Sequence, residues 1–255
     1  MRADSFFAEK FGSRTRAKDA LLRGLVLRAG KPLSPSDDVR EGEDFTFLDA
    51  GELHVSRGAN KLARGLDAFG ACVEGEVFAD LGASTGGFTE VLLSRGARRV
   101  YAVDVGKAQL APSLAEDARV VVMDETNARY LTPEKFPEPL DGVVSDLSFI
   151  SLKLILPAVS CLLREGGRAF VLFKPQFECG GRGLGKGGIL PAKYHRALLA
   201  DFYAFCLTQR LAPCAVVPAP ILPRKNIEYV VHLVKDGQPV PPERFLRVIQ
   251  ALGRE

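Results

Sequence analysis

The sequence predicts an α/β protein in which a small α+β domain precedes a doubly wound sheet. From residue 77 onward, short apolar segments typical of buried strands alternate with segments of helical periodicity. Aspartates or a lysine stand at the ends of these strands, which is where ligands bind in such sheets. We therefore expect a small domain over residues 1–49, a linker over 50–60 and the sheet domain over 61–255.

The small N-terminal domain begins with apolar residues at helical spacing. Phenylalanines within residues 6–11 form one apolar face, and a second amphipathic segment follows a glycine break. Ser13 or Thr15 is expected to cap this second helix. Residues 25–27 and 45–47 suit short strands, so the domain is predicted as two helices followed by a small β layer.

The sheet domain is predicted from apolar segments that alternate with helical ones. Five strands are expected over residues 77–81, 99–104, 119–124, 141–146 and 167–174. Two later strands, over 215–217 and 229–234, are expected as a hairpin-like pair at one edge. Helices are expected after the first strand as far as residue 96, and over 108–117, 152–163 and 191–211. The side chains at the strand ends, which a ligand should meet, are Asp80, Asp104, Asp124, Asp146 and Lys174.

Composition limits the class of protein. Apolar residues make up 47% and charged residues 25%, which is ordinary for a globular protein and excludes disorder, collagen and coiled coil. The five cysteines are scattered and never spaced C-x-x-C, so we expect no disulfide framework, no metal site and a reducing, cytoplasmic compartment. No segment approaches the roughly 18 consecutive apolar residues that cross a bilayer, and the first residues lack the apolar stretch of a signal peptide. We therefore expect a soluble protein with no membrane partner.

The formal net charge of +3 conceals a strong local polarity. Residues 10–31 contain seven lysines and arginines against one aspartate, and residues 37–49 contain six acids against one arginine. A basic helix with its flanking loop is a candidate phosphate-binding surface. The alternative is a solvated helix face that the acidic segment balances, and charge alone leaves both interpretations open.

Residues 80–88, with the sequence DLGASTGGF, form the most specific local motif. Gly82 permits a tight turn after the strand, and Gly86 and Gly87 permit close approach of a ligand to a helix start. The motif is not a P-loop, because no Lys-Ser or Lys-Thr pair follows the glycines. It is not a dinucleotide fingerprint either, since Ser84 replaces the second glycine and Asp80 would repel a pyrophosphate.

A cationic ligand without phosphate fits these residues better. S-Adenosylmethionine carries a sulfonium and an ammonium group, which acids beside the loop attract. Asp104 is placed to accept hydrogen bonds from ribose hydroxyls, and Asp124 from the adenine amino group. A glycine-rich turn without a ligand is the alternative. The candidate cofactor-binding residues are Asp80, Gly82, Ser84, Thr85, Gly86, Gly87, Phe88, Asp104, Asp124 and Asp146.

Six motifs, in this order along the chain, resemble one known family. They are SRGANKL at 56–62, DLGASTGGFTEVLL at 80–93, AVDVGKAQL at 102–110, DETNARYL at 124–131, SDLSFISL at 145–152 and FKPQFE at 173–178. Together they look like the TlyA family of ribosomal RNA 2′-O-methyltransferases, whose catalytic domain is FtsJ-like. Residues 12–31 are similar to the small RNA-binding domain of ribosomal protein S-four. The resemblance implies a Rossmann-like, S-adenosylmethionine-dependent methyltransferase sheet preceded by a small α+β RNA-binding domain.

The resemblance also implies a catalytic Lys-Asp-Lys-Glu tetrad. The matching residues are Lys61, Asp146, Lys174 and Glu228. Asp146 and Lys174 already stand at strand ends, whereas Lys61 and Glu228 rest on the resemblance alone. The tetrad would work by acid–base chemistry, with Lys174 accepting or sharing the proton of a ribose 2′-hydroxyl. Lys61 would supply a neighbouring cation, and the two acids would hold the lysines in place.

By resemblance, the reaction is methyl transfer from S-adenosylmethionine to the ribose 2′-hydroxyl of a cytidine in large-subunit RNA, small-subunit RNA or both. The expected partners are ribosomal RNA or ribosomal subunits. The candidate RNA-binding residues are Lys10, Arg14, Arg16, Lys18, Arg23, Arg57, Arg182 and Lys186. The alternatives are a membrane-active haemolysin (a name often attached to this family), a non-catalytic RNA-binding protein, and an NAD-dependent oxidoreductase.

Two features close to tetrad residues allow more than one interpretation. The glycine-rich segment 180–188 is predicted as a mobile lid over RNA phosphates, with a simple flexible loop as the alternative. Phe149 and Phe177 could stack on a flipped base, but packing in the core is the favoured prediction. The three histidines do not cluster in sequence and are assigned no metal or acid–base function.

Overall fold

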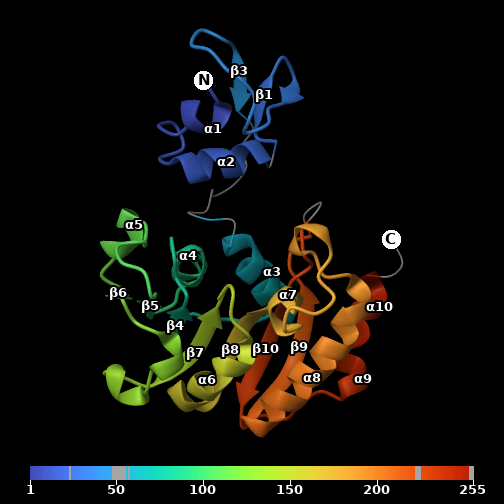
Figure 1. The fold of residues 1–255 in the computed structure, drawn as a ribbon. Coiled ribbons are helices and arrows are strands. Elements are labelled where there is room, and N and C mark those ends of the chain that lie inside the picture. Colours follow the sequence, from blue (N-terminus) through green and yellow to red (C-terminus); the bar gives the residue numbers. More distant parts are fainter. Residues whose placement is uncertain (23, 48–55, 57, 222–224, 253–255) are drawn as a thin grey trace. The chain divides into compact units, whose positions relative to one another are not determined.

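The chain divides into two compact units, Met1–Ala59 and Asn60–Glu255. The computed structural model describes all residues except 23, 48–55, 57, 222–224 and 253–255 (Figure 1). Each unit has its own hydrophobic core. The two units are described separately below.

The first unit packs two short helices against a small antiparallel sheet. Its helices are α1 (Ala3–Phe6) and α2 (Arg14–Leu22), and its strands are β1 (Val26–Arg28), β2 (Lys31–Pro32) and β3 (Phe45–Phe47), in the order β2-β1-β3. Ser13 Oγ accepts a hydrogen bond from the N–H of Arg16 at 3.1 Å, so Ser13 caps α2 as one of the two predicted candidates. Phe7 lies at the centre of the core, in edge-to-face contact with Phe11 and Phe45.

The second unit is built on a seven-stranded sheet with the order β6-β5-β4-β7-β8-β10-β9. The strands are β4 (Val77–Leu81), β5 (Arg99–Val103), β6 (Val120–Met123), β7 (Leu140–Ser145), β8 (Leu163–Phe173), β9 (Leu211–Pro218) and β10 (Tyr229–Lys235). The first five are parallel, and β10 lies antiparallel between β8 and β9. The predicted doubly wound sheet with an antiparallel pair at one edge is therefore confirmed.

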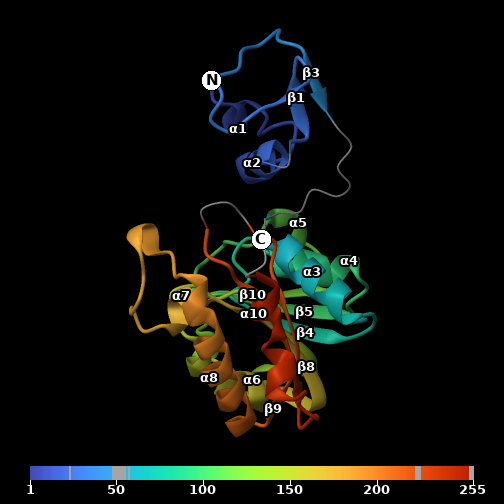
Figure 2. The same ribbon diagram turned by 90° about the vertical axis from the view of Figure 1, so that its right-hand side faces the viewer.

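Helices cover both faces of this sheet, as the edge-on view in Figure 2 shows. They are α3 (Ala59–Phe69), α4 (Gly87–Ser94), α5 (Pro112–Ala115), α6 (Leu156–Leu162), α7 (Pro175–Glu178), α8 (His195–Thr208), α9 (Pro242–Phe245) and α10 (Arg247–Leu252). Short 3-10 turns lie at Ala128–Tyr130, Pro133–Lys135, Leu152–Leu154, Lys186–Gly188 and Ala192–Tyr194. In that view α3 and α4 lie on one side of the strands, and α6 and α8 lie on the other.

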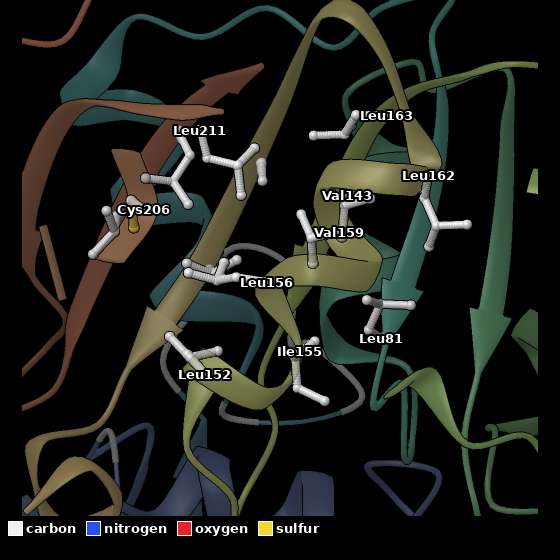
Figure 3. Close-up of a cluster of buried hydrophobic side chains, with 14 of the residues drawn as sticks. Leu81, Val143, Leu152, Ile155, Leu156, Val159, Leu162, Leu163, Cys206 and Leu211 are labelled. Atoms are coloured by element: carbon white, nitrogen blue, oxygen red, sulfur yellow. The ribbon is translucent and has the colours of Figure 1, made fainter. Parts of the chain in front are cut away.

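The larger core lies on the face covered by α6 and α8. Alternate residues of β8 and β10 enter it, including Val171 and Val231, while their neighbours face α3 on the opposite side. Figure 3 shows Leu156 and Val159 of α6 among the buried side chains of this core. Because both faces of the central strands are buried, their carboxyl ends are held at one rigid edge.

Several predicted bounds differ from the observed elements. The helix expected over 191–211 is α8 over His195–Thr208, and residue 211 already belongs to β9. A helix was expected over 108–117, but α5 spans only Pro112–Ala115. The reason is Ala108, which has a left-handed φ of 50° and donates its N–H to Asp124 Oδ2 at 2.8 Å, so the chain there forms a loop. In addition, α3 begins at Ala59, so the last residues of the expected linker are helical.

Candidate active site

Three of the four predicted tetrad residues meet at one edge of the sheet for topological reasons. Asp146 directly follows β7 and Lys174 directly follows β8, so both lie at carboxyl ends of parallel strands. Glu228 directly precedes β10, which runs in the opposite direction. Since Tyr229 pairs with Phe173, the start of β10 lies beside the end of β8, and Glu228 reaches the same edge as Lys174.

Lys61 reaches this edge from a helix rather than from a strand. It lies in the first turn of α3, on the face of the sheet that carries Val230. One turn later, Gly65 packs directly on Val230: a Cβ at Gly65 would lie 2.5 Å from Val230 Cγ1. The absence of a side chain at Gly65 therefore lets α3 approach β10 closely enough for Lys61 to contact Glu228.

The four side chains form a linear array of alternating charge. Lys61 Nζ lies 2.8 Å from Glu228 Oε2 and 3.4 Å from Asp146 Oδ2. Lys174 Nζ lies 2.7 Å from the other oxygen of the same carboxylate, Asp146 Oδ1. Asp146 thus lies between the two lysines, and all four predicted tetrad residues are brought together in one connected group.

Two further residues extend this array at its ends. Gln176 Nε2 donates a hydrogen bond to Glu228 Oε1 at 3.1 Å, and Lys174 Nζ donates one to Ser148 Oγ at 2.8 Å. Sequence reasoning did not single out either residue. Their spacing from tetrad residues could have identified them, because Ser148 is two residues after Asp146 and Gln176 is two residues after Lys174.

The electrostatic surroundings give the two lysines different roles. Burial lowers the pKa of Lys61, but the charges of Asp146 and Glu228 outweigh burial and raise that pKa above its ordinary value. Lys61 is therefore a stable cation at neutral pH. Lys174 is 5% exposed and lies next to one carboxylate, a hydroxyl and the ring of Phe177.

The glycine-rich loop between β4 and α4 has the backbone conformation that its glycines permit. Gly82 and Gly86 have φ values of 85° and 95°, and Ser84 between them is also left-handed at 49°. The N–H of Ser84 donates to Asp104 Oδ2 at 2.8 Å. Gly87 and the residue after it begin α4, where N–H groups have no acceptor within the helix and can bind a ligand.

Asp80 lies deeper than a ligand-facing residue. It belongs to β4, is 1% exposed, and its Oδ2 accepts hydrogen bonds from the N–H of Thr89 at 3.0 Å and from Thr89 Oγ1 at 2.7 Å. Burial raises the pKa of Asp80 to about 7, although the hydrogen bonds from Thr89 act in the opposite direction. Asp80 therefore anchors the first turn of α4 and is not a fully ionised group at neutral pH.

Asp104 and Asp124, the acids that follow β5 and β6, hold the loops at this edge of the sheet. Asp104 accepts hydrogen bonds from two backbone N–H groups, those of Ser84 and Gly106, each at 2.8 Å. Asp124 accepts one from Ala108 at 2.8 Å. Each carboxylate oxygen has a second lone pair, so both acids can still accept hydrogen bonds from hydroxyl or amino groups. This donor and acceptor set suits S-adenosylmethionine, whose carboxylate can meet the helix start while its ribose and adenine donate to the acids.

Left-handed residues other than glycine mark this edge of the sheet. One follows each of β4, β5, β6 and β7, namely Ser84, Ala108, Glu125 and Phe149. Such conformations are costly for residues with a side chain, and they concentrate at functional sites. Their distribution agrees with a ligand site at the carboxyl ends of the strands.

The prediction that Phe149 packs in the core is wrong. Phe149 is 90% exposed and has a φ of 64°, and its ring lies 5.1 Å from that of Phe177. Asp146 and Ser148, on the same loop, both contact Lys174. The left-handed backbone at Phe149 directs its side chain out of this loop and into solvent. The exposed ring of Phe149 and the half-buried ring of Phe177 therefore lie beside the Lys174 end of the charged array.

The glycine-rich segment after α7 is anchored at its end. Asn226 accepts the N–H of Leu190 through Oδ1 at 2.8 Å and donates through Nδ2 to the carbonyl of Gly188 at 3.0 Å. The buried His195 contacts the carbonyl of Leu190 at 3.2 Å and the hydroxyl of Tyr229 at 2.8 Å. Asn226 and Tyr229 lie on either side of Glu228, so the end of this segment is attached to the start of β10.

The predicted RNA-binding cations fall into several groups. Lys18, Arg182 and Lys186 are exposed, and Lys10 lies 4.1 Å from the ring centre of Phe47. Arg14 instead forms a 3.2 Å ion pair with Asp4, whose carboxylate is 3% exposed, and so supports the first unit. Arg16 is partly buried. Arg23 and Arg57 lie outside the described residues.

No group of three or more His, Cys, Asp or Glu side chains in the described part of the chain is arranged to hold a metal ion. Within the same residues, no helix is long and apolar enough to cross a membrane.

Comparison with known proteins agrees with this geometry. A model of the FtsJ-like methyltransferase family matches residues 54–235. The 16S/23S rRNA (cytidine-2'-O)-methyltransferase TlyA of Mycobacterium tuberculosis is 48% identical over 74% of this chain and 72% of its own length. The 23S rRNA (cytidine-2'-O)-methyltransferase TlyA of Campylobacter jejuni is 33% identical over 71% of this chain and 77% of its own length. A solved structure from Streptococcus thermophilus, named "Putative hemolysin", is 36% identical with a TM-score of 0.79, covering 100% of this chain and 96% of that one.

Proposed function

Since this chain belongs to the FtsJ-like methyltransferase family, with S-adenosylmethionine as the methyl donor, we propose that it methylates the ribose 2′-hydroxyl of a cytidine in ribosomal RNA. The observation that carries the proposal is the connected array Glu228–Lys61–Asp146–Lys174 at the carboxyl edge of the sheet. Both cytidine-2'-O-methyltransferase relatives support the same substrate class. The site of action would be the cytoplasm, where ribosomal RNA is found.

The array explains how a ribose hydroxyl becomes a nucleophile. When bound, S-adenosylmethionine supplies an activated methyl group on a good leaving group. Lys174 accepts the hydroxyl proton. Lys61 remains charged beside the carboxylate that the two lysines share, that of Asp146. Glu228 holds Lys61 in place from the other side. Positioning of the hydroxyl beside Lys174 supplies much of the rate acceleration.

The surroundings of the array suit an RNA substrate. Phe149 offers an exposed aromatic ring, packed against the half-buried Phe177 next to Lys174, on which an unpaired base can stack. Arg182 and Lys186 on the glycine-rich segment offer cations for backbone phosphates. The first unit, with the exposed Lys18, would capture folded RNA, as the likeness of residues 12–31 to a ribosomal-protein domain implies.

The test is a map of ribose methylation. Purified protein, S-adenosylmethionine and ribosomal subunits from a strain that lacks this enzyme are incubated, and 2′-O-methylation is read along both ribosomal RNAs. We expect one or two cytidines to become methylated with the wild-type protein and none with a Lys174→Ala variant. An unchanged map in the presence of folded, cofactor-binding protein would overturn the proposal.

A further inference from the structure

Lys174 is held by two contacts that differ in kind. Its Nζ donates a 2.8 Å hydrogen bond to Ser148 Oγ and forms a 2.7 Å ion pair with Asp146 Oδ1. Asp146 Oδ1 makes no hydrogen bond within the described residues, so its contact with Lys174 is one of charge and not of hydrogen-bond direction. An ion pair attracts an ammonium group without fixing its rotation, whereas a hydrogen bond does fix it.

The loop that carries Ser148 is itself held firmly. At its start Asp146 contacts both lysines. At its end, Glu178 of α7 accepts hydrogen bonds from Ser151 Oγ at 2.5 Å and from the N–H of Leu152 at 2.8 Å. Ser148 therefore lies between two fixed points of the loop. The second is provided by α7, the helix that begins directly after Lys174.

The direction of the Lys174 amino group matters for its proposed role. A neutral lysine nitrogen carries two N–H bonds and one lone pair, and only the lone pair accepts a proton. In the ammonium form, one N–H is directed at Ser148 and a second is attracted by Asp146. The third direction at Nζ, which holds the lone pair in the neutral form, is left for the substrate. The proton of the ribose hydroxyl moves onto this lone pair as the 2′-oxygen bonds to the methyl carbon, and the carbon–sulfur bond breaks with its electrons on sulfur.

We propose that Ser148 is a positioning residue, which orients the amino group of Lys174 toward the ribose hydroxyl. This inference rests on the proposed function, since it assigns Ser148 a part in the same reaction. Asp146 is the charged group in contact with Lys174, and Lys61 and Glu228 are connected to it through Asp146. All three are charged, and Ser148 is a neutral hydroxyl, so its loss leaves the charge of the site unchanged.

The test compares Ser148→Ala with Ser148→Thr, which restores the hydroxyl. Methyl transfer to unmethylated ribosomal subunits is measured at varied concentrations of S-adenosylmethionine and of subunits. We expect Ser148→Ala to lower kcat about tenfold to a hundredfold with both KM values within about twofold of wild type, and Ser148→Thr to recover most of the rate. Ser94→Ala is the matched control, because Ser94 is an exposed serine whose hydroxyl bonds to the carbonyl of Val91 in α4.

A second measurement is independent of the RNA. In protein labelled with 15N-lysine, we expect the side-chain N–H signal of Lys174 to be protected from exchange in wild type, Ser148→Thr and Ser94→Ala, and unprotected in Ser148→Ala. A kcat equal to that of wild type in Ser148→Ala would overturn the inference. So would a kcat in Ser148→Thr as low as that of Ser148→Ala, with unchanged affinity for the cofactor. Failure of the wild-type protein to methylate any ribosomal RNA would instead overturn the proposed function, and the exchange experiment would still decide whether Ser148 holds Lys174.

Discussion

Lys174 Nζ lies 2.7 Å from Asp146 Oδ1, and the two residues follow neighbouring parallel strands, β8 and β7. The same carboxylate contacts Lys61 through its other oxygen. One acid thereby links the buried Lys174 to a second lysine, whose pKa Asp146 and Glu228 raise.

Replacement of Lys174 by alanine should abolish methyl transfer and leave the affinity for S-adenosylmethionine nearly unchanged. The variant lacks the amino group that we propose as the proton acceptor, while the loops held by Asp104 and Asp124 are untouched. Methyl incorporation and calorimetric cofactor binding measure the two effects separately. Lys135→Ala is the control, since Lys135 is an exposed lysine in the Pro133–Lys135 turn. Turnover close to wild type in Lys174→Ala would remove Lys174 from the mechanism.

Replacement of Glu228 by glutamine should slow the reaction less than loss of Lys174. Lys61 would lose one of its two anionic partners but keep Asp146. It would therefore be held less firmly in place and remain in the array. We expect kcat to fall about tenfold, with cofactor affinity unchanged. Glu243→Gln, at an exposed position in α9, should have no effect. A Glu228→Gln variant as inactive as Lys174→Ala would mean that Glu228 acts directly on substrate.

Replacement of Gly86 by alanine should impair both cofactor binding and stability. A Cβ there would lie 2.3 Å from Leu114 Cδ1 and 2.7 Å from Leu110 Cδ1, in addition to the strain of a φ of 95°. Gly75→Ala carries similar backbone strain, at a φ of 73°, but has no atom within 4 Å of the new Cβ. Strain of this kind costs on the order of 1 kcal/mol, so Gly75→Ala should lose about that much stability and no cofactor affinity. Equal behaviour of the two variants in calorimetry and urea unfolding would refute the clash at Gly86.

The buried Asp80 should make stability depend on pH. Its pKa is about 7 in the folded protein and 3.8 as an ordinary value, so folding takes up a proton between these pH values. The contribution of Asp80 to the free energy of unfolding therefore falls as pH rises from about 4 to about 7 and is constant above that range. Asp80→Asn removes this contribution and keeps an oxygen for Thr89. Urea unfolding measures the free energy of unfolding of both proteins. The value for Asp80→Asn minus the value for wild type should increase as pH rises from about 4 to about 7. A difference that does not change with pH would show that Asp80 is ionised in the folded protein.

The exposed cations of the first unit should bind RNA through charge. Replacing Lys10 and Lys18 together by alanine should weaken binding to ribosomal RNA and reduce its dependence on salt by roughly two phosphate contacts. Arg14→Ala should instead destabilise the first unit, because it removes an ion-pair partner of the buried Asp4. Binding measured at several salt concentrations, with hydrogen exchange to follow the first unit, distinguishes the two effects. An unchanged salt dependence in the double lysine variant would place the RNA elsewhere.

The positions of the strands along the chain and of the glycine-rich loop could be predicted from sequence because both depend on local patterns. Continuous apolar segments mark buried parallel strands, and glycines mark a left-handed loop. Asp146 and Lys174 are found by the same reasoning, since each directly follows a strand. The actual extent of α5 was not predictable in this way, because a hydrogen bond between Ala108 and Asp124, residues on two different loops, prevents the longer helix.

The amino-acid sequence alone determined the fold class, the glycine-rich loop and half of the charged array, because local pattern places Asp146 and Lys174 at strand ends. Only the tertiary structure brought Glu228 and Lys61 to them: an antiparallel β10 reverses the direction of the chain, and Gly65 lets α3 approach that strand. The pKa of Asp80 and the exposure of Phe149 were likewise settled by tertiary structure. The physical reason is that burial and charge depend on neighbours from distant parts of the chain, which no local pattern contains.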